Sequence, residues 1–168
     1  MDNPPPILLT GFLGIGKTTL LNDLLKAPEC AKTLVLIIEL GEEVFDHRLV
    51  DTCVENAVVP DKGCLCCTVL GALSGSLQSL YWQRHDKKIA HFDHITIATT
   101  RVADRAPILH DDQLAGVVTC VDALFADVQL SEQPEACKQA ILADLLFLTN
   151  TDLVCAEIVA ALSERLVV

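Results

Sequence analysis

The stretch ILLTGFLGIGKTTLLNDLLK, residues 7–26, decides the fold of this chain. The run Ile7–Thr10 has the apolar character of a strand, and a pattern of helical period follows from Lys17 to Lys26. Between them, GFLGIGKT at Gly11–Thr18 fits G-x-x-x-x-G-K-[ST] at every position. A strand, such a turn and a helix in this order form the phosphate-binding element of P-loop proteins, so the sequence predicts a site for a purine nucleoside triphosphate.

Each residue type in this loop has a physical task. Gly11 and Gly16 permit backbone conformations that turn successive N–H groups inward as an anion nest, and the following helix adds its positive N-terminal end. Lys17 is expected to reach the β- and γ-phosphates and Thr18 to give its hydroxyl to Mg²⁺, so these two are the candidate catalytic residues. Kinases, ATPases and GTPases all use this loop, and the motif alone leaves the base open.

Apolar runs of strand length alternate with helical stretches along the rest of the chain. Strands are predicted at Thr33–Ile38, His94–Thr99, Gly116–Val121 and Leu145–Thr149, and helices at Thr68–His85, Ala136–Ala143 and Cys155–Leu166. This alternation predicts an α/β protein with the three-layer P-loop NTPase fold and a mostly parallel central sheet, whose ligands bind beyond the carboxyl ends of the strands. The length of 168 residues suits one domain.

Composition excludes some classes of function. The net charge of −11 argues against nucleic-acid binding, which needs a surface rich in lysine and arginine. Hydrophobic residues make up 51% of the chain, yet no apolar run approaches the roughly 20 residues that span a bilayer. The N-terminal residues MDNPPPILLT lack the positive region of a signal peptide. We therefore expect a cytoplasmic protein with no membrane or nucleic-acid partner.

Three of the eight cysteines are clustered in GCLCC at residues 63–67. Without a secretion signal, reduced thiols are expected. Thiolates near a helix N-terminus have lowered pKa values, and Cys64, Cys66 and Cys67 together suit Zn²⁺ or Cu(I). Zn²⁺ prefers about four ligands, which leaves room for another group. Chance clustering and a thiol–disulfide switch are the alternatives that remain open.

The run LLFL before Thr149-Asn150-Thr151-Asp152 bears on base recognition. Many GTPases follow a strand with Asn-Lys-x-Asp, whose Asp accepts hydrogen bonds from the guanine ring. Asp152 is placed to do this, although the two leading positions are altered. The alternative is that Asp152 is an ordinary N-cap of the last helix.

The chain resembles the CobW family of P-loop GTPases, the metal-chaperone-like relatives of the hydrogenase and urease nickel-insertion GTPases. The segments that carry the resemblance are LLTGFLGIGKTTLLNDLL, ELGEEVFDHRLV at Glu39–Val50, GCLCC, VADRAP at Val102–Pro107, VVTCVDALFAD at Val117–Asp127 and ADLLFLTNTDL at Ala143–Leu153. Together they extend from about residue 7 to residue 152.

The resemblance implies binding of GTP or GDP with Mg²⁺, slow GTP hydrolysis, and Zn²⁺ or Co²⁺ held by the C-x-C-C thiols for a metal-requiring client protein. The implied nucleotide contacts are Gly11, Gly14, Ile15, Gly16, Lys17, Thr18, Thr19 and Asp152, and the implied metal contacts are Thr18 for Mg²⁺, Glu39, Glu42, Cys64, Cys66 and Cys67. On this comparison residues 1–168 are the GTPase domain and the family's C-terminal domain is absent, while the oligomeric state, including a homo-oligomer, is left open.

Three departures from the family pattern affect the expected activity. Ile37-Ile38 stands where the family has Glu-Asn, Ala98-Thr99-Thr100-Arg101 where it has Glu-x-Thr-Gly, and Thr149-Asn150 where it has Asn-Lys. Phosphate binding depends mainly on backbone and a lysine and should survive, whereas hydrolysis and guanine selectivity are more vulnerable. The alternatives are therefore a degenerate module that binds nucleotide or zinc without useful turnover, and an ATP-using P-loop enzyme unrelated to metal.

Overall fold

The computed structural model describes residues 3–38, 57–58, 75, 77–99 and 114–166. In chain order the elements are β1 (Pro6–Gly11), α1 (Lys17–Lys26), η1 (Pro28–Cys30), β2 (Thr33–Ile38), β3 (Ala57–Val58), β4 (His94–Thr99), β5 (Gly116–Asp122), α4 (Ala126–Glu132), α5 (Pro134–Ile141), β6 (Leu145–Thr149), η3 (Thr151–Leu153) and α6 (Ala156–Leu166). Residue 75 and residues 77–85 are also helical. No helix of this described part is long and apolar enough to cross a membrane.

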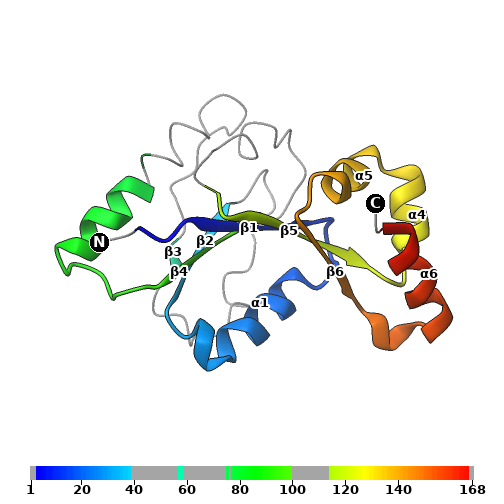
Figure 1. The fold of residues 1–168 in the computed structure, drawn as a ribbon, viewed down its shortest axis with the longest axis horizontal. Helices are drawn as coiled ribbons and strands as arrows, with labels where there is room; N and C mark the ends of the chain where they lie inside the picture. The colour runs from blue at the N-terminus through cyan, green and yellow to red at the C-terminus, as the bar shows by residue number, and fades with distance from the viewer. Residues whose placement is uncertain (1–2, 39–56, 59–74, 76, 100–113, 167–168) are drawn as a thin grey trace.

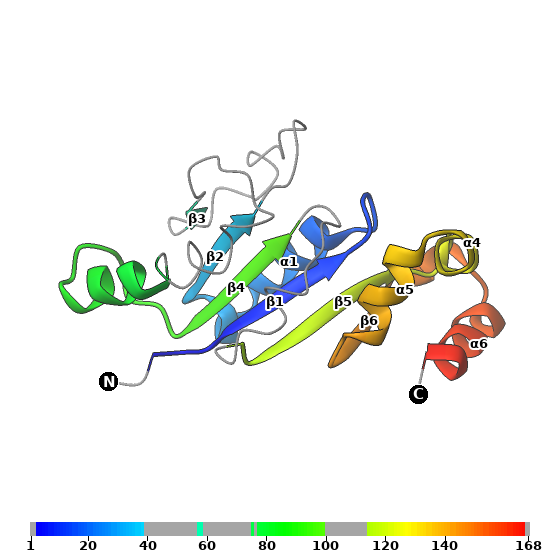
Figure 2. The same ribbon diagram turned by 90° about the horizontal axis from the view of Figure 1, so that it is seen from above.

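The strands form a parallel sheet in the order β3-β2-β4-β1-β5-β6. Helix α1 lies on one face of this sheet and α4 and α5 lie on the other (Figures 1 and 2). The predicted α/β three-layer architecture with a parallel sheet is therefore confirmed. Strand β1 lies inside the sheet, between β4 and β5, so the loop that follows it emerges between the ends of neighbouring strands.

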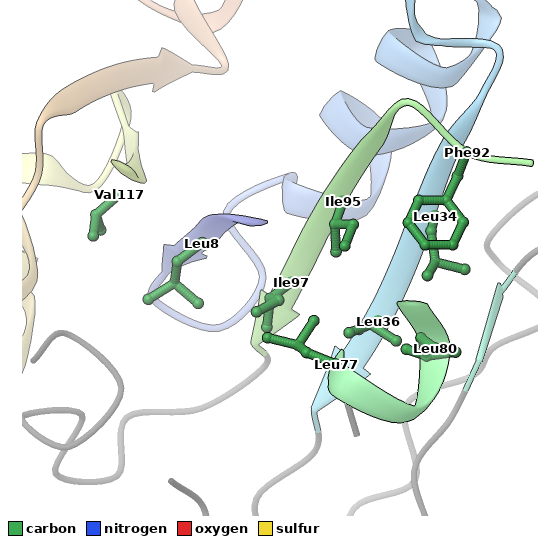
Figure 3. Packing of buried hydrophobic residues seen from close by; sticks show 9 residues of the cluster. All are labelled: Leu8, Leu34, Leu36, Leu77, Leu80, Phe92, Ile95, Ile97 and Val117. Carbon is green, nitrogen blue, oxygen red and sulfur yellow. The ribbon is translucent and has the colours of Figure 1, made fainter. Parts of the chain in front are cut away.

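Successive side chains of a strand point to opposite faces of the sheet, and in the interior strands β1, β4 and β5 most of them are buried. Leu9 of β1 packs with Ile15 and with Leu21 of α1 on one face, whereas the preceding Leu8 packs on the other. Figure 3 shows this second cluster, in which Leu77 and Leu80 lie over the sheet. Its members are Leu8, Leu34, Leu36, Leu77, Leu80, Phe92, Ile95, Ile97 and Val117.

The predicted elements largely match the observed ones. The helix at Lys17–Lys26 and the strands at Thr33–Ile38, His94–Thr99 and Leu145–Thr149 have the predicted bounds. The helix predicted at Ala136–Ala143 is wrong by two residues at each end: it begins at Pro134, whose fixed φ suits the first turn. Helix α4 was not predicted. Of the helix predicted at Thr68–His85, residues 68–74 and 76 lie outside the described residues.

Phe92 is the aromatic member of the second cluster and is 1% exposed. Its replacement by alanine should lower the free energy of unfolding by about 3–5 kcal/mol, because a large buried side chain is lost and the cavity closes only in part. Denaturant unfolding followed by circular dichroism measures this change. Trp82, which is 64% exposed, provides the control. Trp82→Ala should change stability by no more than about 0.5 kcal/mol, and equal effects of the two substitutions would contradict the packing described here.

Candidate functional site

The loop between β1 and α1 has the backbone that its glycines were expected to allow. Gly11, Gly14 and Gly16 all have positive φ, at 138°, 77° and 85°. Gly16 is the N-cap of α1, and no side chain of a described residue caps this helix end. The amides of the first turn are the donors that a helix leaves without an intrahelical partner, and they carry the positive end of the helix dipole. This geometry suits a bound anion.

Gly11 is closely surrounded by neighbouring atoms. A Cβ at this position would come within 2.4 Å of the Ile15 Cδ1 atom and 2.6 Å of the Cys120 carbonyl oxygen. Ile15 is 1% exposed and belongs to the cluster beneath α1, so its side chain anchors the loop to the core. The loop therefore has a defined position before any ligand is considered.

The Lys17 ammonium bonds to the loop itself. Its Nζ donates to the carbonyl oxygen of Gly11 at 2.8 Å and to that of Phe12 at 2.5 Å. These bonds place a positive charge at the loop, where a phosphate would need it. Thr18 and Thr19 follow in the first turn of α1, Thr18 half-buried and Thr19 exposed.

Cys120 of β5 lies beside the start of this loop, since it is the register partner of Gly11. Burial raises the pKa of its thiol to about 11, and the nearby charge of Lys17 offsets only part of this rise. At neutral pH the Cys120 side chain is therefore a protonated, packed group.

Thr149, at the end of β6, connects the expected base-recognition segment to the phosphate loop. Its hydroxyl oxygen lies 2.7 Å from the Ile15 carbonyl oxygen and 3.4 Å from that of Val121. A hydroxyl has one hydrogen, so the shorter contact is the hydrogen bond. The bond joins residues that are 134 positions apart and ties the two segments together.

Asn150 and Asp122 form a second link. Asn150 has a left-handed backbone, with φ at 56°, and its Nδ2 donates to Asp122 Oδ2 at 2.9 Å. The other carboxylate oxygen of Asp122 accepts from the Leu124 amide at 2.9 Å. Asp122 directly follows the predicted strand Gly116–Val121 and is not among the expected site residues. The signal that could have revealed more is an acid at the carboxyl end of a strand, the edge where ligands bind in such sheets.

Asp152 lies in the short helix η3, exposed to solvent, with no hydrogen bond or ion pair to any other described residue. The alternative that it caps the last helix is wrong, because α6 begins four residues later, at Ala156. Asp152 therefore stays a candidate for base recognition at the carboxyl edge of β6.

Two of the sequence departures meet in the sheet. Ile37 of β2 and Ala98 of β4 are register partners, and both are buried in the apolar cluster that contains Ile15 and Leu21. Ile37 and Ala98, which replace glutamates of the family pattern, are thus part of one buried apolar cluster that also holds Ile15 of the phosphate loop.

Several expected site residues lie outside the described residues. They are the candidate metal ligands Glu39, Glu42, Cys64, Cys66 and Cys67, together with Arg101. In the part of the chain that is described, no group of three or more His, Cys, Asp or Glu side chains is arranged to hold a metal ion. Of the expected nucleotide site and the expected metal site, the described residues therefore include only those of the nucleotide site and Thr18.

Comparison with known proteins finds relatives that match most of this chain. The zinc chaperone YjiA of Escherichia coli is 36% identical over 155 residues, which cover 86% of this chain and 48% of that protein. The zinc-regulated GTPase metalloprotein activator 1 of Schizosaccharomyces pombe is 30% identical over 183 residues, covering 99% of this chain and 43% of that protein. The chain thus spans about half the length of these relatives.

A solved structure is similar over nearly the whole chain. The Zn(II)-bound YjiA GTPase of Escherichia coli matches 99% of this chain and 54% of its own, with a TM-score of 0.68 at 28% identity. The family model described as CobW/HypB/UreG, nucleotide-binding domain, matches residues 5–167. The chain therefore belongs to the CobW/HypB/UreG family, and its match is to the nucleotide-binding domain of that family.

Proposed function

We propose that this chain is the nucleotide-binding domain of a GTP-dependent metal chaperone. It binds GTP or GDP with Mg²⁺ at Gly11–Thr18, hydrolyses GTP slowly, and carries Zn²⁺ or Co²⁺ for a metal-requiring client protein. The observation that carries the proposal is the shaped phosphate loop, in which the Lys17 ammonium bonds to the carbonyls of Gly11 and Phe12.

Nucleotide binding is supported at both ends of the expected ligand. At the phosphate end, the positive φ of Gly14 and Gly16 suits a polyanion, and so does the start of α1, which no side chain of the described part caps. Thr18 supplies a hydroxyl oxygen in the first turn, a hard donor of the kind that Mg²⁺ prefers. At the base end, the exposed carboxylate of Asp152 is an acceptor suited to the donors of guanine.

The proposed metal cargo rests on the cysteine cluster and on the relatives. Cys64, Cys66 and Cys67 provide three soft ligands within four residues, with Glu39 and Glu42 as further candidates. Two relatives are named for zinc, and the similar solved structure is Zn(II)-bound. We infer that nucleotide state and metal affinity are coupled through the segment that contains Glu42.

Lys17→Ala should weaken GDP binding by at least about tenfold, because a charge-assisted contact to phosphate is lost. Isothermal titration calorimetry with GDP measures the change. Lys26→Ala is the matched control, since this lysine is in the last turn of the same helix and pairs only with the exposed Asp23 among the described residues. Undiminished affinity in Lys17→Ala would refute a phosphate site at this loop.

Replacing Cys66 and Cys67 together by serine should abolish tight Zn²⁺ binding, because two soft ligands are removed. Cys155→Ser should retain it, as Cys155 is an exposed thiol at the start of α6, away from the cluster in sequence. Both variants are titrated with Zn²⁺ under reducing conditions, against wild type. In wild type, the affinity should differ between the complexes with GDP and with a non-hydrolysable GTP analogue. Equal affinities would remove the proposed coupling.

A second candidate function is a module that binds nucleotide or zinc without useful turnover. The buried apolar pair of Ile37 and Ala98 favours it, because side chains at these positions cannot orient water or a metal ion. Where this module binds nucleotide, it shares the phosphate loop with the first candidate and differs from it in the hydrolysis of GTP.

Phosphate release from GTP distinguishes the two candidates. A slow chaperone GTPase should release phosphate above the background rate, and Thr18→Ala should remove this activity together with any stimulation by Zn²⁺. A wild-type protein that binds GTP tightly and shows no release above background would support the second candidate. Release that persists in Thr18→Ala would instead point to a contaminating enzyme and contradict the first.

A further inference from the structure

The carboxylate of Asp122 joins two turns at the ligand-facing edge of the sheet. Asp122 ends β5 and is 3% exposed. One oxygen accepts from the Leu124 amide in its own turn, and the other accepts from the Asn150 side chain in the turn after β6, both at 2.9 Å. Capping its own turn would need only one of these oxygens, so the second bond has a separate consequence.

The hydrogen bond from Asn150 to Asp122 fixes Asn150, the residue that begins the turn containing Asp152. The carbonyl of Asn150 accepts from the Leu153 amide at 3.1 Å, which closes the turn that contains Asp152. The Asn150 backbone is left-handed, a conformation that asparagine adopts more readily than most residues. Asn150 thus bonds Asp122 through its side chain and Leu153, at the end of η3, through its backbone carbonyl.

The Asp152 side chain has no other described partner to position it. Its placement follows from the backbone between Thr149, which is held by the phosphate loop, and Leu153, which is held by Asn150. Holding an acceptor in place before the ligand arrives lowers the ordering cost of binding.

We propose that Asp122 is a positioning residue for base recognition. Through Asn150 it holds the turn 150–153 so that Asp152 presents its carboxylate to the ring N–H and amino donors of guanine. This inference rests on the proposed nucleotide function and adds a specificity determinant to it, formed by the Asp122–Asn150 hydrogen bond.

The test uses variants that keep the left-handed backbone. Asn150→Gly removes the side-chain bond, and glycine adopts this conformation without strain. Asn150→Asp also tolerates it but places two carboxylates against each other. The double variant Asp122→Asn with Asn150→Asp reverses donor and acceptor and can restore the bond. Asp127→Asn, which changes an exposed carboxylate of α4, is the matched control for charge.

Each protein is titrated with GDP, ADP and inorganic pyrophosphate, and its thermal unfolding is recorded without ligand. Asn150→Gly and Asn150→Asp should each weaken GDP binding by about tenfold, which corresponds to the loss of one hydrogen bond to a carboxylate, and should lower the preference for GDP over ADP. Pyrophosphate affinity should change by less than about twofold, since the phosphate loop is untouched. The exchanged double variant should recover GDP preference, and Asp127→Asn should match wild type.

Four outcomes would overturn the inference. Wild-type GDP preference in both single variants would show that the bond has no role in base recognition. Equal loss of GDP and pyrophosphate affinity would show a general structural role, as would a double variant that regains thermal stability without regaining GDP preference. Wild type that binds GDP and ADP equally would also reject it, while leaving the phosphate site intact. In this assay the proposed nucleotide site itself fails if wild type binds none of the three ligands. Should Asn150→Asp not fold, Asn150→Gly and the double variant give the same decision.

Discussion

The rest of the site depends on the bonds from the Lys17 ammonium to the carbonyl oxygens of Gly11 and Phe12. A loop whose carbonyl oxygens are turned toward a cation can present its N–H groups to an anion. Gly11 also packs against Ile15 and the Cys120 backbone. The turn is therefore held by the positive φ of its glycines, by packing and by the Lys17 charge together. Such a loop offers a ligand a formed surface, so little binding free energy is spent on ordering it.

The sheet brings the other parts of the site to this loop. Parallel pairing of β1, β5 and β6 places the ends of three strands side by side, and the register sets Gly11 beside Cys120 and Asp122 beside Thr149. The Thr149 hydroxyl can then reach the Ile15 carbonyl. The phosphate loop and the proposed base-recognition segment, which are far apart in sequence, are therefore joined directly by a hydrogen bond.

Local sequence patterns were enough to predict most helices and strands. Contacts between residues far apart in the chain could not be predicted from the sequence. Glycines followed by a helical pattern were enough to give α1 its bounds. Helix α4 escaped prediction because it has only seven residues, and its apolar Val128 is exposed and gives no periodic signal. The motif revealed the loop, but no spacing rule shows that Asn150 bonds Asp122, since this contact requires the β5–β6 register. The substitutions at Ile37 and Ala98 likewise looked separate until the register of β2 and β4 made them neighbours.

The position of Cys120 beside the phosphate loop has a consequence for which thiols of the chain can bind a metal ion. Among the described residues, Cys120 is the cysteine paired in register with Gly11 of the phosphate loop, and its raised pKa keeps it protonated at neutral pH. A protonated, buried thiol is a poor ligand, because soft metals bind the thiolate. At neutral pH a thiol at this position would therefore compete weakly with thiolates for a soft metal ion or for an oxidant. The chain can thus place a thiol next to the proposed phosphate site in a form that is weakly reactive at neutral pH.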